Sequence, residues 1–127
     1  MPEVVLDASA LLSLLNAEPG AGVVAEALPG AIISTVNLSE VVAKLRDAGM
    51  PEKAIRQALQ GLGLEIIPFD EEQAYEAGLL RAATKATGLS LGDRGCLSLA
   101  QRLGLPALTA DRTWLDLSVE AKVRVIR

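Results

Sequence analysis

The order of apolar and polar positions predicts short buried strands that alternate with amphipathic helices. Short apolar runs are typical of buried strands, and apolar residues at i, i+3, i+4 and i+7 are typical of helices that bury one face. The apolar runs predict strands at 3–6, 31–35, 64–67, 106–109 and 123–126. The helical spacing predicts helices at 9–16, 22–28, 38–45, 55–62, 70–86 and 96–103.

The alternation of these elements favours one fold class. Strands that alternate with helices through short loops predict a three-layer α/β/α sandwich, with a mostly parallel central sheet of four to five strands and right-handed crossovers. Gly and Pro occur singly where such a fold turns, and no repeat or low-complexity tract interrupts the chain, so we expect a single domain over 1–127. Sites in such sheets gather at the carboxyl ends of the strands.

Composition excludes several chemistries. The chain has 127 residues with no histidine and one cysteine, which rules out Ser-His-Asp and Cys-His catalysis and histidine-containing zinc sites. Cys96 occupies an apolar position of a helical pattern and is predicted to be a buried structural thiol. We find neither a signal peptide nor an apolar run of membrane-spanning length, and therefore expect a soluble cytoplasmic protein with no membrane association.

Four acidic residues stand where predicted strands pass into helices. Asp7 and Asp111 follow the first and fourth strands, and Glu40 lies in the helix after the second. Asp93 precedes Cys96 by three residues, so its side chain is expected to point along an apolar stripe toward the sheet. Because the carboxyl ends of parallel strands share one edge of a sheet, the four carboxylates are predicted to converge there.

Each of these acids also has a purely structural explanation. Asp7 and Asp111 are good N-cap residues for the helices that follow them. Asp116 is a competitor for Asp111, but its place beyond Trp114 indicates an exposed helix end. Capping boxes or an i,i+4 ion pair are open to the other acids, as Asn37–Glu40, Ser90–Asp93 and Glu40–Lys44.

A cluster of carboxylates repels itself unless a cation neutralises it. A site built from oxygen ligands alone selects Mg²⁺ or Mn²⁺ over zinc or copper. Such an ion makes water a nucleophile at neutral pH and stabilises the displacement at a phosphodiester, and this chemistry needs no histidine. We expect Asp7 and Asp93, with Glu40 or Asp111, to hold one such ion.

Short motifs around these acids resemble those of PIN-domain ribonucleases. They are Val-Leu-Asp-Ala-Ser-Ala at 5–10, Ser-Glu-Val-Val at 39–42, Leu-Gly-Asp-Arg at 91–94 and Leu-Thr-Ala-Asp-Arg-Thr-Trp at 108–114. The resemblance covers essentially the whole chain, and its compact length is similar to that of the VapC toxins of toxin–antitoxin pairs. It implies an acidic metal cluster of Asp7, Glu40, Asp93 and Asp111, with Ser9 and Thr109 as supporting hydroxyls.

The resemblance also implies a function and partners. In that family RNA is cut by metal-dependent hydrolysis, and the toxins commonly form homodimers and pair with an antitoxin that covers the active site, often with an arginine. Trp114 stands where many relatives have Phe, and it is expected to pack in the core all the same. A housekeeping PIN nuclease remains an open alternative to a toxin.

The formal net charge of −4 counts against an RNA substrate, because phosphate contacts usually come from a basic surface. The proposed ligands supply several of these acids, and bound cations would offset them locally. Substrate phosphates are then expected to meet four cations near the ligands, whose alternative role is plain solvated surface. These cations are Lys44, Arg46, Arg94 and Arg112.

Two other functions fit parts of the sequence. In a Mg²⁺-dependent phosphatase or phosphotransfer domain a strand-end aspartate becomes phosphorylated, but Ser9 stands where such phosphatases have a second Asp, and no strand-end lysine is evident. In a non-enzymatic interaction module the acids are helix caps, and the apolar residues of 11–15 and 55–62 form an interface instead of plain core.

Overall fold

The computed structural model describes residues 2–127, and its centre is a sheet of five parallel strands. The strands are β1 Val4–Leu6, β2 Ala31–Ser34, β3 Glu65–Ile67, β4 Ala107–Thr109 and β5 Val123–Val125. They lie in the order β3-β2-β1-β4-β5, so β1 is central and β3 and β5 form the edges. All five predicted strands are present, and the mostly parallel sheet is confirmed as a fully parallel one.

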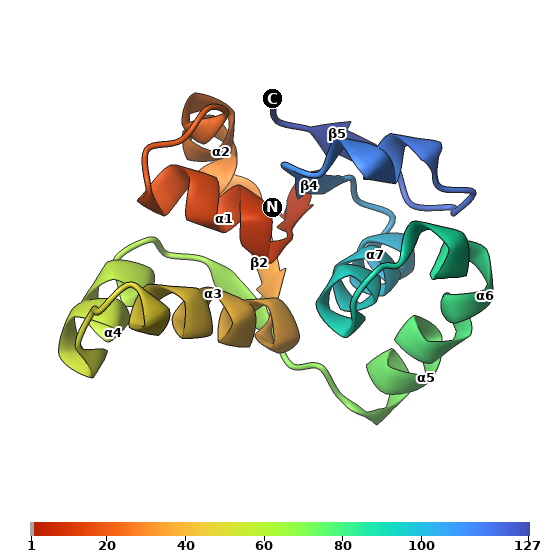
Figure 1. Cartoon of the computed structure of the whole chain (residues 1–127), viewed down its shortest axis with the longest axis horizontal. Coiled ribbons are helices and arrows are strands. Elements are labelled where there is room, and N and C mark those ends of the chain that lie inside the picture. The colour runs from red at the N-terminus through yellow and green to blue at the C-terminus, as the bar shows by residue number, and fades with distance from the viewer. Residues whose placement is uncertain (1) are drawn as a thin grey trace.

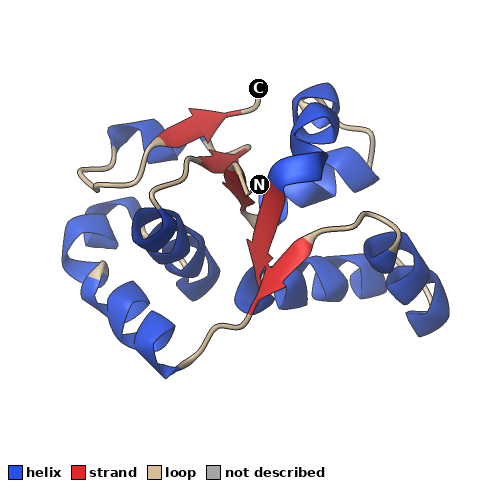
Figure 2. Cartoon of the chain, turned by 180° about the vertical axis from the view of Figure 1, so that it is seen from behind, coloured by secondary structure: helices blue, strands red, loops and turns tan. Residues whose placement is uncertain are grey.

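Helices cover both faces of this sheet (Figure 1). They are α1 Ala8–Leu15, α2 Ala21–Ala27, α3 Thr35–Asp47, α4 Glu52–Gln60, α5 Glu71–Leu79, α6 Arg81–Thr84 and α7 Leu91–Leu103, with short 3-10 turns η1 Leu28–Gly30, η2 Lys85–Thr87 and η3 Arg112–Asp116. Seen from behind, the strands run between the two groups of helices (Figure 2). The predicted three-layer sandwich is confirmed. Within residues 2–127 no helix is long and apolar enough to cross a membrane.

Two separate apolar cores result from the alternation of side chains along the strands. Val4 and Leu6 of β1 point into the core beneath α1 to α4, whereas Val5 points into the core beneath α7. Cys96 and Trp114 are fully buried in this second core, as predicted from their apolar positions. Since both faces of the sheet are covered, the three central strands β1, β2 and β4 are buried along their whole length, whereas the edge strands β3 and β5 include Glu65 and Arg124.

The strand order creates a switch point at the centre of the sheet. From β1 the chain runs outward through β2 to β3, then returns and adds β4 and β5 on the other side of β1. In the register, Leu6 is paired with Leu108, and the Asp7 N–H donates to the Leu108 carbonyl at 3.1 Å. Asp7 and Thr109 therefore lie side by side at the crevice where doubly wound sheets bind their ligands.

Helices α3 and α7 approach each other closely because α7 has glycine at two contact positions. A Cβ on Gly95 would lie 2.7 Å from Cγ1 of Val36, and a Cβ on Gly92 would overlap the Glu40 carboxylate. The absence of side chains at these positions brings the first turn of α7 against the first turns of α3. Helix α3 begins directly after the carboxyl end of β2, so this contact forms one wall of the crevice.

Helices α4 and α7 begin at Glu52 and Leu91, before the predicted 55 and 96, and two further differences have a clear physical cause. The single helix expected at 70–86 is broken at Leu80 into α5, α6 and η2. The Thr84 hydroxyl donates to the Leu80 carbonyl at 2.8 Å, a contact that bends helices, and Gly78 weakens the turn before the break. Helix α3 begins at Thr35, earlier than expected, because the Ser34 hydroxyl caps it by accepting from the Val36 N–H.

Alanine is predicted to have opposite effects at Gly78, which has open space around it, and at Gly95, which packs against Val36. Gly78→Ala meets no atom within 4 Å and should stabilise the protein by about 1 kcal/mol through helix propensity. Gly95→Ala must displace Val36, and we expect this overpacking to make it about 1–3 kcal/mol less stable than Gly78→Ala. Urea unfolding of both variants measures this difference. Equal gains in both would show that α3 and α7 do not need the close contact.

Candidate functional site

Asp7 is the most enclosed acid of the chain, with 3% of its surface exposed. Its Oδ1 accepts from the Ala10 N–H at 2.8 Å, so the predicted N-cap of α1 is confirmed. The Ser9 hydroxyl lies 2.8 and 2.9 Å from its two oxygens, and the Thr109 hydroxyl donates to Oδ2 at 2.5 Å. Donors from α1 and β4 thus fix the Asp7 carboxylate at the switch point.

Glu40 reaches the same crevice from α3. The expected capping box with Asn37 is wrong, because α3 begins at Thr35 and Glu40 lies in its second turn. Asn37 is buried instead, and its Nδ2 donates to Glu40 Oε1 at 3.2 Å and to the Gly92 carbonyl at 3.0 Å. The Glu40 carboxylate therefore lies against the backbone of α7, at the place where Gly92 has no side chain.

Asp93 lies in the first turn of α7 and is only half-buried. The predicted capping box is confirmed: Asp93 Oδ2 accepts from the Ser90 N–H at 3.0 Å, and the Ser90 hydroxyl accepts from the Asp93 N–H at 3.2 Å. This cap draws the side chain toward the start of the helix, away from the apolar stripe along which it was expected to point. It occupies one carboxylate oxygen and leaves Asp93 at the mouth of the crevice.

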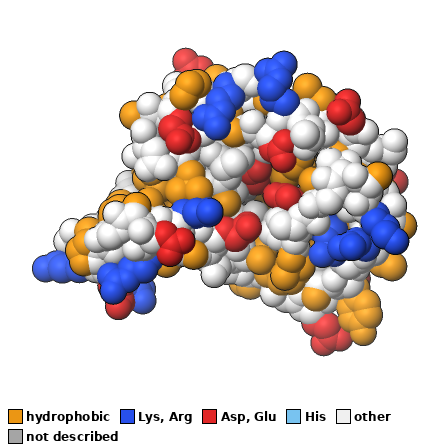
Figure 3. Space-filling view, viewed as in Figure 1, with side chains coloured by type: hydrophobic (Ala, Val, Ile, Leu, Met, Phe, Trp, Pro, Cys, Tyr) orange, Lys and Arg blue, Asp and Glu red, His pale blue; other side chains and the backbone are white. Residues whose placement is uncertain are grey.

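The charge of Asp93 acts on both Asp7 and Glu40. Burial, with a smaller contribution from the charge of Asp93, raises the pKa of Asp7 from its ordinary value of 3.8 to about 6. Burial and the charge of Asp93 also raise the pKa of Glu40. Acidic side chains gather near the centre of the face in Figure 3, over the place where α1, α3 and α7 meet in Figure 1.

The thiol of Cys96 lies beneath this cluster. Burial raises its pKa well above the usual value, and the charges of Asp7, Asp93 and Glu40 act in the same direction. A thiol in this state is protonated and unreactive. Cys96 is therefore a structural residue of the core, and the three carboxylates lie near enough for their charges to act on it.

Asp111 is placed differently from the other three acids. Its carboxylate is exposed and caps η3, where Oδ1 accepts from the Thr113 N–H at 2.9 Å and from the Thr113 hydroxyl at 2.7 Å. Its backbone N–H donates at 3.0 Å to the Thr109 hydroxyl, which in turn holds Asp7. The structure thus joins Asp111 to the site through its backbone, while its carboxylate faces Thr113.

The donor set fits a hard divalent cation in its chemistry. All of its side-chain donors are oxygens, and they come from buried or half-buried carboxylates whose charges no cationic side chain pairs within residues 2–127. In the same range, no group of three or more acidic or thiol side chains already has an arrangement that could hold a metal ion. Both oxygens of Asp7 accept hydrogen bonds, whereas Glu40 and Asp93 each keep one oxygen outside such bonds.

Three of the four cations expected to meet RNA are held by backbone carbonyls. Each guanidinium donates from Nη1 to a carbonyl oxygen, and none of the three forms an ion pair within residues 2–127. The contacts are Arg94 to Ala77 on α5 at 3.1 Å, Arg46 to Met50 at 3.1 Å, and Arg112 to Arg127 at 2.7 Å.

Lys44 is the exception among these cations. It takes part in none of the ion pairs within residues 2–127, so the expected Glu40–Lys44 pair is absent, although its charge lowers the pKa of Glu40. It lines a hollow of about 300 Å³ between α1 and α3, together with Ser9 and Arg127. This hollow adjoins the acidic cluster through Ser9 on one wall and through α3 on the other.

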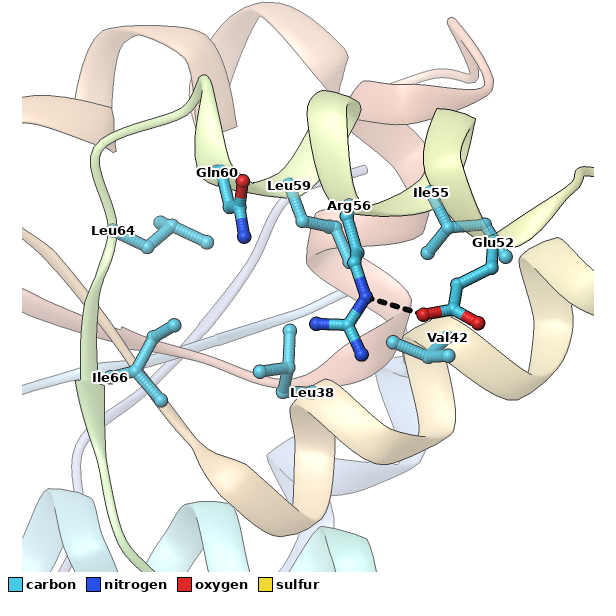
Figure 4. A pocket seen from close by; sticks show the side chains of 9 residues that line it. All are labelled: Leu38, Val42, Glu52, Ile55, Arg56, Leu59, Gln60, Leu64 and Ile66. Carbon is cyan, nitrogen blue, oxygen red and sulfur yellow. Dashed lines mark hydrogen bonds and ion pairs between the residues drawn. The ribbon is translucent and has the colours of Figure 1, made fainter.

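A larger hollow, of about 540 Å³, is apolar and contains none of these acids. Its lining comes from α3, α4 and β3, and the ion pair between Arg56 Nε and Glu52 Oε2 at 2.8 Å lies in it (Figure 4). Ile55 and Leu59 were expected to be core or interface. Ile55 is buried, whereas Leu59 is only partly covered and lines this hollow with Val42. The two charged residues of its lining, Glu52 and Arg56, pair with each other.

Sequence reasoning missed two residues of the site. Asn37 was noted only as half of a capping box, and Gly92 was not singled out. The signal for Gly92 was its place directly before Asp93, at the start of a helix where glycine is unfavourable. Asn37 had a signal too, since a polar residue four places before Val41 lies on the buried face of α3.

The raised pKa of Asp7 predicts a pH-dependent stability. Above its folded pKa of about 6, Asp7 is ionised and buried; between that value and 3.8 the folded state binds a proton that the unfolded state does not. Without metal, stability should therefore rise as pH falls, and Asp7→Asn should remove about 2 kcal/mol of this rise between about pH 7.5 and about pH 4.5. Urea unfolding in a chelator at both pH values measures it.

The control is Asp70→Asn, which changes another N-cap aspartate, on α5, that accepts from the Gln73 N–H. This exposed cap should leave the pH dependence of the parent in place. Asp7→Asn should also be more stable than the parent at about pH 7.5, because asparagine keeps the cap and removes the buried charge. Lower stability of Asp7→Asn at that pH would contradict the prediction.

Comparisons with known sequences assign the chain to a family. The PIN-domain family model matches residues 4–119. The VapC ribonuclease Mb2780c of Mycobacterium bovis is 30% identical over an alignment 115 residues long, which covers 83% of this chain and 88% of the relative. Ribonuclease VapC42 of Mycobacterium tuberculosis matches with the same identity and coverage, 30%, 83% and 88%.

Solved structures agree with this assignment at the level of the fold. A toxin-antitoxin complex from Klebsiella pneumoniae superposes with a TM-score of 0.78 at 24% identity, covering 98% of this chain and 98% of the other. The DNA-bound VapBC of Salmonella typhimurium gives 0.78 at 19% identity and covers 100% of both chains. The resemblance seen in the sequence motifs is confirmed, and the chain belongs to the PIN-domain family.

Proposed function

We propose that this chain is an endoribonuclease that hydrolyses phosphodiester bonds of RNA and depends on Mg²⁺ or Mn²⁺. The carrying observation is the meeting of Asp7, Glu40 and Asp93 at the switch point of a PIN-family sheet, where burial and the charge of Asp93 raise the pKa of Asp7 and of Glu40. A divalent cation would neutralise the charges of such a cluster and relieve their repulsion. The ribonuclease names of the relatives that share 30% of their residues with the chain support the same activity.

In this proposal Asp7, Glu40, Asp93 and Asp111 form the acidic site, and Ser9 and Thr109 orient Asp7. A divalent ion bound there would lower the pKa of water and offset the negative charge that develops at the phosphate. Ser9 and Thr109 donate hydrogen bonds to the oxygens of Asp7 and so fix the orientation of its carboxylate. Asp111 contributes through the backbone N–H that holds the Thr109 hydroxyl.

The RNA backbone is proposed to pass the hollow between α1 and α3. Lys44 is the cation there whose charge is not paired, and it lies within electrostatic reach of Glu40. A phosphate bound by Lys44 would lie close to the acidic side chains and would leave their carboxylates available to a cation. Arg46, Arg94 and Arg112 would contribute only after they release a carbonyl.

We further propose that the chain is the toxin of a toxin–antitoxin pair, acts in the cytoplasm as a homodimer, and binds a cognate antitoxin protein. The VapC names of the relatives and the toxin-antitoxin complexes among the structures of the same fold support this role. A housekeeping PIN nuclease is the alternative. A short neighbouring reading frame with a DNA-binding fold would favour the toxin.

Two other functions are less well supported. A phosphotransfer aspartate must expose an oxygen to the phosphoryl group, but Asp7 is buried and both of its oxygens accept hydrogen bonds. An interaction module would use the acids as caps only. Asp7, Asp93 and Asp111 do cap helices, yet Glu40 caps nothing and still faces Asp93.

The site assignment predicts the loss of activity on neutralising either of two acids. Asp7→Asn and Asp93→Asn should each reduce metal-dependent cleavage of single-stranded RNA by at least about 100-fold, because each removes a ligand charge. Cleavage of a labelled RNA with Mg²⁺, with Mn²⁺ and with chelator measures this. Circular dichroism checks that the variants fold.

Asp116→Asn is the matched control, since it neutralises an exposed acid of η3 that lies outside the cluster. It should cut RNA at the parent rate. If the folded Asp7→Asn and Asp93→Asn proteins also cut at that rate, the site is assigned wrongly. If the parent cuts as well in chelator as with metal, the metal dependence is wrong.

The proposed path of the RNA predicts a binding defect in Lys44→Ala. Loss of one phosphate contact should raise KM several-fold with little change in kcat and should reduce the slope of log Kd against log salt by about 1. Fluorescence anisotropy of a labelled RNA on the Asp93→Asn background measures Kd without cleavage. Lys53→Ala, an exposed lysine of α4 outside the hollow, is the control. An unchanged salt slope in Lys44→Ala would exclude the contact.

A further inference from the structure

Asn37 is a buried amide that joins two helices at the acidic cluster. It is 1% exposed and lies in the first turn of α3. One atom, Nδ2, donates both to Glu40 Oε1 at 3.2 Å and to the Gly92 carbonyl at 3.0 Å. We propose that Asn37 is a positioning residue that fixes the Glu40 carboxylate beside Asp93 and thereby sets the affinity of the site for a divalent cation. The inference rests on the proposed metal-dependent function.

Glu40 has little else to hold it. Within residues 2–127 its carboxylate accepts a hydrogen bond from Asn37 alone, and Lys44 one turn further on α3 does not pair with it. A free glutamate side chain has several rotamers, and ordering it costs entropy each time a ligand binds. The amide removes part of that freedom in advance.

The position requires a donor that contacts two acceptors. Glu40 Oε1 and the Gly92 carbonyl both accept hydrogen bonds, so an aspartate at 37 would face two like groups and an aliphatic residue would satisfy neither. Gly92 completes the arrangement, because any Cβ there would occupy the space of the Glu40 carboxylate. Asn37 and Gly92 together hold Glu40 against the turn of α7 that carries Asp93.

The other end of the amide indicates that the contact is not there for stability alone. Asn37 Oδ1 is buried and has no hydrogen-bond partner within the described residues. An unsatisfied buried acceptor costs stability, and a pair of apolar residues would join α3 to α7 without that cost. The cost of the amide is explained if the Asn37 Nδ2 donor is needed to orient the Glu40 carboxylate.

Gln73 provides a matched control for a purely structural role. It is also an amide with 1% exposure, it also contacts α7, through the Ser98 hydroxyl at 3.4 Å, and it also has an unsatisfied atom, Nε2. It lies on α5, in the layer on the other side of α7 from α3. Substituting Gln73 should therefore disturb the packing of α7 to a similar extent without touching Glu40.

The experiment measures Mn²⁺ affinity by calorimetry in the intact protein, with thermal unfolding alongside. Asn37→Ala should weaken Mn²⁺ binding about 10- to 100-fold, as is common when a group that orients a metal ligand is removed. Asn37→Leu, which keeps the number of side-chain heavy atoms and removes the donor, should weaken it similarly and gives a second variant should Asn37→Ala fail to fold. Gln73→Ala should lower the melting temperature but keep the parent affinity.

A double-mutant cycle separates an effect through Glu40 from a general one. If Asn37 acts through Glu40, Asn37→Ala should weaken Mn²⁺ binding in the parent but not further in Glu40→Gln. Equal losses in both backgrounds, or parent affinity in Asn37→Ala and Asn37→Leu, would overturn the positioning role while leaving the proposed function intact. A parent protein that binds no Mn²⁺ would overturn the proposed function and this inference together.

Discussion

The burial of the Asp7 carboxylate at the centre of the sheet is the interaction on which both fold and site depend. A buried carboxylate is costly unless donors or a cation compensate it. Ser9 and the Ala10 N–H from α1 and Thr109 from β4 supply donors, so the same contacts join β1, α1 and β4. They compensate the charge only in part, because the pKa of Asp7 still rises to about 6. The remaining cost is what a bound cation would relieve.

The close contact of α3 with α7 is the second constraint. In a fold of this class two helices on opposite faces of a sheet need not touch, but here they meet beyond the carboxyl ends of the strands, where no sheet lies between them. Gly92 and Gly95 make the approach possible, and it brings Glu40 to Asp93. Helix packing, rather than strand register, therefore assembles this half of the acidic cluster.

The sequence allowed the fold to be predicted well, because the three central strands are buried on both faces and their apolar runs are hard to mistake. The site was predicted as far as it follows from strand ends. Asp7 and Thr109 meet because the register of β1 and β4 aligns them. Side-chain direction was the part that could not be deduced. The carboxylate of Asp111 turns to Thr113, and that of Asp93 turns back to Ser90, through local hydrogen bonds that compete with the tertiary ones.

The contribution of Asn37 lay beyond the sequence for a related reason. Its spacing of three from Glu40 fits a capping box as well as it fits a contact across helices, and only the true start of α3 at Thr35 decides between them. The break at Leu80 is similar, since the periodicity of 70–86 contains no proline to mark it. Local patterns specify which face of a helix is buried, but not where its first turn begins.

Helix caps and metal ligands are often treated as alternative explanations for an acid at a strand end, but a carboxylate has two oxygens and serves both purposes. In Asp93 one oxygen caps α7 and the other remains outside that bond. The cap restricts the side chain before any ligand arrives, so a ligand that is also a cap needs less ordering when a cation binds. Since the caps form as the helices form, the acidic cluster is built by folding itself, and its repulsion is a cost that a bound cation would relieve.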